Sequence, residues 1–139
     1  MAISGVAVAD ENFKITIDHD RRFLKIVLHG LWTRETVDQY RDTVRKTVNA
    51  TPLNGYSLQD VGVLIDTRML AVQSRDVAEY YSQIPIYSAA HPRKIATLVV
   101  SRLVGMQVRR IGTGTQEIFE DEDEAIGWLF ADMKRGIGL

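Results

Sequence analysis

Residues 61–68 read VGVLIDTR, and residues 69–79 continue MLAVQSRDVAE. The first stretch is almost continuously apolar, as is typical of a central strand that is covered on both faces. The second contains Ser74, whose hydroxyl can accept a hydrogen bond from a free backbone N–H at the start of a helix. Apolar residues then recur at helical spacing until Pro85, which cannot continue a helix. These residues therefore predict a buried strand, a loop, and a helix that begins at about Ser74.

Strand-like and helix-like patterns alternate along the rest of the chain. Strands are predicted at residues 13–18, 23–29, 61–66, 95–101 and 116–120, and helices at 33–50, 74–84, 101–110 and from Asp121 onward. The first two strands are close enough in sequence to form an antiparallel hairpin. Strands that alternate with helices indicate a mostly parallel sheet, so we expect an α/β fold.

Length and composition indicate one domain. The chain has 139 residues, 45% hydrophobic and 25% charged, with a net charge of −1 and no cysteine. We expect a partly flexible N-terminal extension at residues 1–12, a domain at 13–135, and a C-terminal tail at 136–139. The near-neutral charge disfavours nucleic acid as a partner. No apolar run reaches the length of a transmembrane segment, and no signal peptide is recognisable, so a cytoplasmic location is expected.

A binding site is expected where the parallel strands meet the helices that follow them, because helix N-termini present free N–H donors there. Candidate residues for this switch or anion-binding rim are Trp32, Asp66, Arg68, Ser74, Arg75, Ser101 and Arg102. Hydroxyl and guanidinium groups in this position suit a phosphate or another small anion. The alternative is that Thr33, Ser74, Ser101 and Asp121 act only as helix N-caps, and this alternative is favoured.

Enzymatic chemistry finds little support in the sequence. None of the three histidines, His19, His29 and His91, shows the spacing of a metal site on a helix. Nucleophile-elbow, phosphate-loop and dinucleotide-binding motifs are all missing from the sequence. The acidic residues 120–124 lack the order of a calcium loop and suit the first turn of a helix. We therefore expect no catalytic residues, no metal and no cofactor.

Several local motifs resemble those of STAS domains, and more closely the uncharacterised bacterial SpoIIAA-like family that shares their fold. The motifs are LHGLWT at residues 28–33, LIDTR at 64–68, IATLVVS at 95–101 and FEDEDEA at 119–125. The resemblance covers nearly the whole chain from Phe13. It implies a single domain with a mostly parallel five-stranded sheet, an N-terminal antiparallel hairpin and about four helices.

In anti-sigma-factor antagonists of this fold, the switch reads approximately Asp-Ser-Ser-Gly-Leu-Gly. The matching residues here are QSRDVA at positions 73–78, of which only Ser74 is shared. Arg75 and Asp76 replace the second serine and a glycine, so a helix cap is favoured over a phosphorylation site at Ser74. What the resemblance implies about function is regulatory protein–protein interaction without catalysis, and this is the leading hypothesis.

A second hypothesis follows from the CRAL-TRIO domains, which resemble this fold and carry lipids. Here the observation is the apolar and aromatic character of residues 80–90, which include Tyr80, Tyr81, Ile84 and Tyr87. This segment could cover an apolar or lipid-like ligand, pack as part of the core, or form a homodimer contact, where tyrosine is common. We expect a homodimer, and the three alternatives for this segment remain open.

Overall fold

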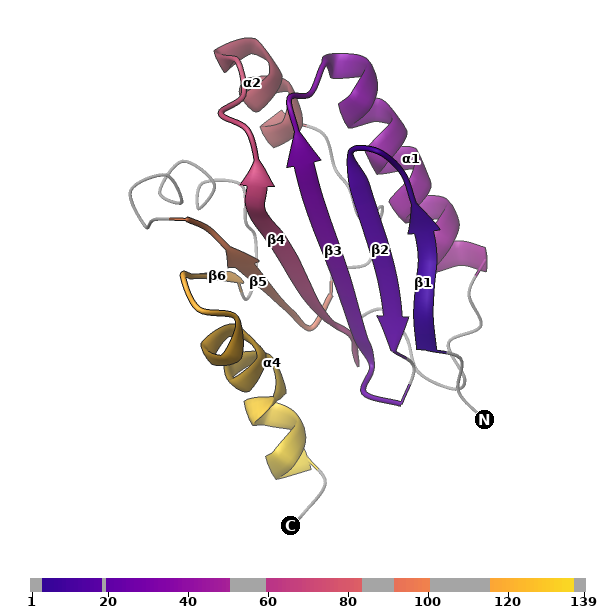
Figure 1. Ribbon diagram of the computed structural model, residues 1–139. Helices are drawn as coiled ribbons and strands as arrows, with labels where there is room; N and C mark the ends of the chain where they lie inside the picture. Colours follow the sequence, from indigo (N-terminus) through magenta and orange to yellow (C-terminus); the bar gives the residue numbers. More distant parts are fainter. Residues whose placement is uncertain (1–3, 19, 51–59, 84–91, 101–115, 137–139) are drawn as a thin grey trace.

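A computed structural model describes residues 4–18, 20–50, 60–83, 92–100 and 116–136 (Figure 1). Six strands form one sheet in the spatial order β1-β2-β3-β4-β5-β6, which is also their order along the chain. Their bounds are β1 Ser4–Ala9, β2 Phe13–Asp18, β3 Phe23–Gly30, β4 Gly62–Leu70, β5 Lys94–Leu98 and β6 Gln116–Phe119. Three helices lie in the described residues, namely α1 Arg34–Ala50, α2 Arg75–Gln83 and α4 Glu122–Gly136.

The direction of the strands confirms the predicted α/β class. β2 and β3 form the expected antiparallel hairpin, with Phe13 opposite Leu28 and Asp18 opposite Phe23. From β3 to β6 every neighbouring pair is parallel. The sheet is therefore parallel except at its N-terminal edge.

The predicted number of five strands is wrong, because β1 adds a sixth. β1 pairs antiparallel with β2, and Ser4 lies opposite Asp18. Residues 4–9 read SGVAVA and had been assigned to the partly flexible extension. Glycine and alanine have low strand propensity, so this segment carries a weak strand signal even though it pairs. The predicted fourth helix at residues 101–110 lies outside the described residues.

Three predicted N-caps begin the three described helices. The side-chain oxygen of Thr33 accepts from the N–H of Thr36 at 3.2 Å, and that of Ser74 accepts from Val77 at 3.2 Å. Asp121 accepts from Glu124 at 3.0 Å. Each contact satisfies an N–H that has no partner within its helix, which fixes the point where the helix begins.

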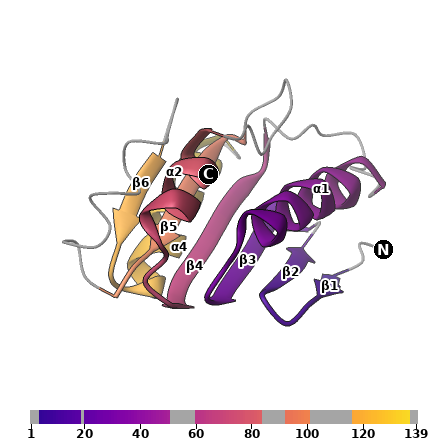
Figure 2. The ribbon, with the colours of Figure 1, turned by 90° about the horizontal axis from the view of Figure 1, so that it is seen from above.

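Helices cover both faces of the sheet (Figures 1 and 2). Alternate residues of a strand point to opposite faces, so Val63 and Ile65 pack in one cluster and Leu64 in the other. The first cluster joins the sheet to α1 and α2 through residues such as Tyr40 and Val77. The second joins it to α4 through Ala125 and Leu129. We call these surfaces the α1/α2 face and the α4 face.

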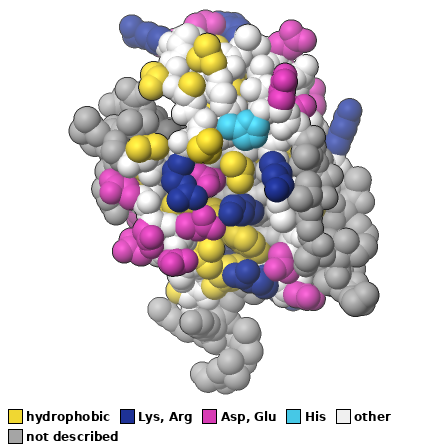
Figure 3. Space-filling model, viewed as in Figure 1, with side chains coloured by type: hydrophobic (Ala, Val, Ile, Leu, Met, Phe, Trp, Pro, Cys, Tyr) yellow, Lys and Arg dark blue, Asp and Glu magenta, His cyan; other side chains and the backbone are white. Residues whose placement is uncertain are grey.

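The α4 face is only partly covered by a described helix. α4 packs mainly against β4, β5 and β6 and reaches β3 only at Phe23 and Lys25. Lys, Arg, Asp and Glu side chains are interspersed with apolar ones there (Figure 3). No described helix is long and apolar enough to span a membrane.

Candidate functional site

Two loops at the carboxyl ends of β3 and β4 are joined by the side chain of Gln73. Its oxygen accepts from the backbone N–H of Trp32 at 2.7 Å. Its nitrogen donates to the carbonyl oxygens of Gly30 at 3.0 Å and Ala71 at 2.6 Å. The N–H of Ala71 also donates to the carbonyl of Gly30 at 3.1 Å. The loops at residues 31–33 and 71–74 are therefore held together beyond the end of the sheet.

Gly30 allows the chain to turn sharply at the end of β3. Its φ of +87° lies in the region that side chains disfavour, and a Cβ there would approach the Asn12 side-chain nitrogen to 3.0 Å. That nitrogen donates to the carbonyl of His29 at 3.3 Å, while the N–H of His29 donates to the carbonyl of Asn12 at 2.9 Å. The turn therefore depends on glycine.

The joined loops and the end of β4 present large apolar side chains to solvent. Leu31 is 67% exposed, Met69 70% and Val72 89%. We call these three residues the apolar rim. Single exposed apolar side chains are common on protein surfaces. Here two lie on the joined loops and the third, Met69, lies in the last part of β4 beside them in sequence, which makes this end of the sheet a candidate interaction surface. None of the three was among the residues that the sequence had indicated.

Trp32, a candidate residue of the switch or anion-binding rim, is buried. Its exposed fraction is 5%, and its ring N–H donates to the carbonyl of His29 at 3.0 Å. The ring lies against Tyr40 with a centroid distance of 5.3 Å and against Phe13 at 6.2 Å. Trp32 therefore anchors the first loop in the core, while its neighbour Leu31 faces solvent.

Ser74 is exposed and caps α2, and Arg75 extends away into solvent. The Arg75 guanidinium binds Glu79 one turn later at 3.1 Å, and its side chain is 92% exposed. Arg34 at the start of α1 forms a two-point ion pair with Asp76 at the start of α2. This contact raises the pKa of Arg34 and lowers the pKa of Asp76. The two helix N-termini beside the apolar rim are therefore tied together.

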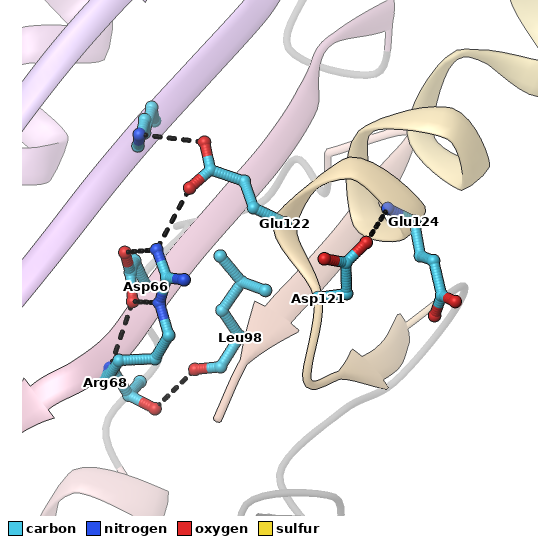
Figure 4. A network of polar contacts seen from close by, with 8 residues as sticks. Asp66, Arg68, Leu98, Asp121, Glu122 and Glu124 are labelled. Carbon is cyan, nitrogen blue, oxygen red and sulfur yellow. Dashed lines mark hydrogen bonds and ion pairs between the residues drawn. The ribbon is translucent and has the colours of Figure 1, made fainter. Parts of the chain in front are cut away.

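Asp66 and Arg68, both candidates for the anion-binding rim, contact each other on the α4 face (Figure 4). β4 has two residues, Thr67 and Arg68, where β3 has only Leu28, because the register shifts between Val27 and His29. Asp66 and Arg68 are two residues apart, so they lie on the same face of the strand as Leu64. Arg68 donates to Asp66 from its side chain at 2.8 and 3.0 Å and from its backbone N–H at 3.0 Å.

Glu122, in the first turn of α4, completes this charged network. Its carboxylate accepts from Arg68 at 3.0 Å and from Lys25 of β3 at 3.1 Å. The network therefore fastens the start of α4 to the two central strands. The acidic residues 120–124 were predicted as a charged first turn, but the contacts of Glu122 across the sheet could not be read from the sequence.

The pKa of Asp66 reflects these contacts. Asp66 is 5% exposed, and burial alone would raise the pKa of its carboxyl group. The hydrogen bonds from Arg68, with the nearby positive charges of Arg68 and Lys25, outweigh burial and hold the pKa below its usual value. Asp66 is therefore a carboxylate whose charge is compensated within the fold, and Arg68 is already engaged by two carboxylates.

Of the proposed ligand or dimer surface, Tyr80 and Tyr81 contact α1. Tyr80 donates from its hydroxyl to Asp38 at 2.6 Å, and Arg34 lies over its ring at 4.8 Å. Tyr81 stacks on Tyr40 with a centroid distance of 6.1 Å. Both tyrosines thus contribute to the packing of α2 against α1. Ile84, Tyr87, Ser101 and Arg102 lie outside the described residues.

The described residues contain no group of three His, Asp or Glu side chains arranged to hold a metal ion. The sequence did not indicate Gln73, Glu122, Lys25 or the apolar rim as residues of a functional site. A signal for the rim was present in the sequence, because Leu31 and Val72 are large apolar residues in segments that were expected to be loops.

Comparisons with known proteins give the fold. No family model and no curated protein matches the chain. An uncharacterised protein of the DUF3478 family from Shewanella loihica PV-4, whose crystal structure has a SpoIIAA-like fold, matches with a TM-score of 0.61 and 20% identity. The match covers 93% of this chain and 97% of that one. SiaC of Pseudomonas aeruginosa matches with a TM-score of 0.43 and 11% identity, over 85% of this chain and 98% of SiaC. The first match shows that this chain has a SpoIIAA-like fold, as its motifs indicated.

Proposed function

We propose that this protein is a non-enzymatic regulatory domain that binds another protein through its apolar rim. The observation that carries the proposal is the exposure of Leu31 and Val72 on loops that Gln73 holds in place, together with that of Met69 at the end of β4. Binding to a surface that is already ordered loses less conformational entropy than binding to one that must first be ordered. The apolar rim therefore combines unburied hydrophobic area with a fixed shape.

The surroundings of the apolar rim suit a protein partner. Methionine adapts its shape to an opposing surface, and Met69 projects from the last part of β4. Charged side chains of α2, including Arg75 and Glu79, follow the second loop in sequence and are exposed. An apolar centre with a polar border is the usual composition of a protein–protein interface.

The other hypotheses receive less support from the described contacts. An anion would compete with Asp66 and Glu122 for Arg68, and with Glu79 for Arg75. An apolar ligand under α2 would displace Tyr81 from Tyr40 and would break the hydrogen bond from Tyr80 to Asp38. Binding at the apolar rim requires neither change.

The proposal is tested by comparing the proteins that are captured from cell extract by tagged variants. Met69→Lys and Val72→Lys each place a charge on the apolar rim without removing a buried side chain. Gly127→Lys is the matched control, because Gly127 is exposed on α4 and a Cβ there would meet nothing within 4 Å. We expect the wild type and the control to capture the same partner and both rim variants to lose it. Capture of one set of proteins by all four would refute the proposal.

A further inference from the structure

The register of β3 and β4 places Met69 of the apolar rim on the α4 face. Lys25, Val27 and His29 alternate along β3 with residues that pack on the α1/α2 face, so their side chains lie on the α4 face. Met69 lies opposite His29, because β4 has one residue more than β3 just before this point. The next residue, Leu70, packs on the α1/α2 face, as alternation requires. The apolar rim therefore continues onto the part of β3 that α4 does not reach.

Lys14 of β2 lies opposite Val27 and extends this surface. Figure 3 shows Lys, Arg and His side chains close to apolar ones on this side of the molecule. We call Lys14, Lys25, Val27 and His29 the open face. Lys14 is exposed, and its ammonium group forms no ion pair with a described residue. The ammonium group of Lys25 binds Glu122, but 31% of the Lys25 side chain is exposed. Two lysines thus present N–H donors to solvent beside the apolar rim.

The carboxylates on the same face of β2 and β4, and that of Glu122, already accept hydrogen bonds. Asp18 accepts from a backbone N–H of the following turn at 3.2 Å, and Asp66 accepts from Arg68 at 2.8 Å. Glu122 accepts from both Arg68 and Lys25. The charge that remains uncompensated on the open face is therefore positive.

The two lysines are spread over neighbouring strands rather than gathered at one point. Because Lys14 lies opposite Val27, it is a diagonal neighbour of Lys25, a relation in which the Cα atoms are roughly 7–8 Å apart. The half-buried side chain of Val27 lies beside both. A segment of polypeptide can place one carboxylate on each lysine and an apolar side chain on Val27, whereas a small anion can occupy only one such point.

We propose that the protein partner of the apolar rim covers the open face with a segment of acidic and apolar residues. This inference rests on the proposed function and adds the chemical class of the partner to it. Complementary charge of this kind speeds association and orients the partner, and salt weakens it. The chain has a net charge of −1, without the broad basic field that is typical of nucleic-acid-binding proteins.

A short peptide of alternating glutamate and leucine is a defined probe of the open face, and a peptide of alternating glutamine and leucine is its uncharged control. Each is titrated into the isotope-labelled full chain, and the amide chemical shifts are followed by NMR. We expect the glutamate peptide to shift the amides at positions 14, 25, 27 and 29, and the glutamine peptide to bind at least about tenfold more weakly. The affinity for the glutamate peptide should fall as sodium chloride is added.

Charge reversal provides matched variants for this titration. Lys14→Glu reverses the uncompensated charge, and Lys46→Glu makes the same change at an exposed lysine of α1, which packs on the opposite face. We expect Lys14→Glu to weaken binding of the glutamate peptide by about tenfold or more, and Lys46→Glu by less than about twofold. Thermal melting verifies that both variants fold. Equal effects of the two, shifts only outside the open face, or tighter binding of a DNA duplex or of phosphatidylglycerol vesicles would overturn the proposal.

Capture from cell extract separates this inference from the proposed function. Lys14→Glu should lose the same partner that Val72→Lys loses, and Lys46→Glu should retain it. If Val72→Lys lost the partner and Lys14→Glu retained it, the acidic segment would be refuted while binding at the apolar rim would stand. If all three variants retained it, the proposed function would fail and this inference with it.

Discussion

The side-chain oxygen of Gln73 lies 2.7 Å from the backbone nitrogen of Trp32, and this hydrogen bond joins the two loops that carry Leu31 and Val72 of the apolar rim. The two residues are 41 positions apart in the sequence. Because the Gln73 nitrogen also binds two carbonyl oxygens, one side chain satisfies three backbone groups. The position of Leu31 relative to Val72 therefore depends on Gln73, a residue that is only partly buried and does not belong to the core.

Replacement of Gln73 by alanine should destabilise the fold by about 1–3 kcal/mol, because it leaves partly buried backbone groups without partners. The free energy of unfolding in urea measures this change. Hydrogen exchange of the amides at Leu31 and Val72 should become faster as well. Gln83→Ala, at an exposed position at the end of α2, is the control and should change stability by less than about 0.5 kcal/mol. Equal effects of the two substitutions would mean that Gln73 does not hold the loops.

Ser74 should behave as a helix cap. Ser74→Ala should reduce the free energy of unfolding by about 1 kcal/mol, whereas Ser74→Asp should retain most of it, because aspartate is an equally good N-cap. Ser82→Ala removes a hydroxyl that binds the carbonyl of Glu79 within α2 and should have little effect. Denaturation curves of the three variants decide the matter. If alanine and aspartate at position 74 were equally destabilising, capping would not be the role of Ser74.

Loss of Arg68 should be destabilising because Asp66 would remain buried without its main partner. For Arg68→Ala we expect about 2 kcal/mol at neutral pH, less than for a fully buried ion pair, since 39% of the Arg68 side chain is exposed. Arg75→Ala breaks the exposed contact with Glu79 and is the control, with an expected change below about 0.5 kcal/mol. Urea denaturation of both variants measures the difference.

The same network predicts a dependence of stability on pH. The pKa of Asp66 is lower in the folded protein than in the unfolded chain, so the folded state favours the ionised form. This contribution is present above the unfolded pKa of about 4 and is lost as the pH falls through the folded pKa. When the pH falls from neutral to acidic, the free energy of unfolding of Asp66→Asn should therefore decrease less than that of the wild type. Parallel losses in the two proteins would show that Asp66 does not contribute to the acid sensitivity.

Two glycines should respond to alanine in opposite directions. Gly127 lies within α4 with open space around it, so Gly127→Ala should stabilise the protein by about 0.5–1 kcal/mol. Gly30 has a positive φ and little space, so Gly30→Ala should destabilise it by more than that amount. Melting temperatures of the two variants provide the measurement. A stabilising effect at Gly30 would be inconsistent with the turn described for the end of β3.

The sequence allowed prediction of those features that depend on local patterns. The apolar run at residues 61–66 indicated a strand covered on both faces, and Thr33, Ser74 and Asp121 marked the three described helix starts. β1 was missed because its small residues give little pattern, and it is recognisable as a strand only through its pairing with β2.

The site depended on long-range contacts that no local pattern contains. Arg68 binds Glu122, which is 54 positions away in the sequence. Trp32 follows a strand, as a rim residue would, but the turn at Gly30 directs it into the core and leaves Leu31 outside. The sequence thus indicated the carboxyl end of the sheet as a candidate site but could not assign which side chains face solvent there.

Site-specific photo-cross-linking in living cells tests the central claim most directly. A photoreactive amino acid is placed at Val72 on the apolar rim or at Gly127 on α4, and the cross-linked species are identified by mass spectrometry. The account predicts a discrete adduct with one other protein at position 72 and none at position 127. It would be contradicted if position 72 gave no adduct, the same adducts as position 127, or only an adduct with a second copy of this chain.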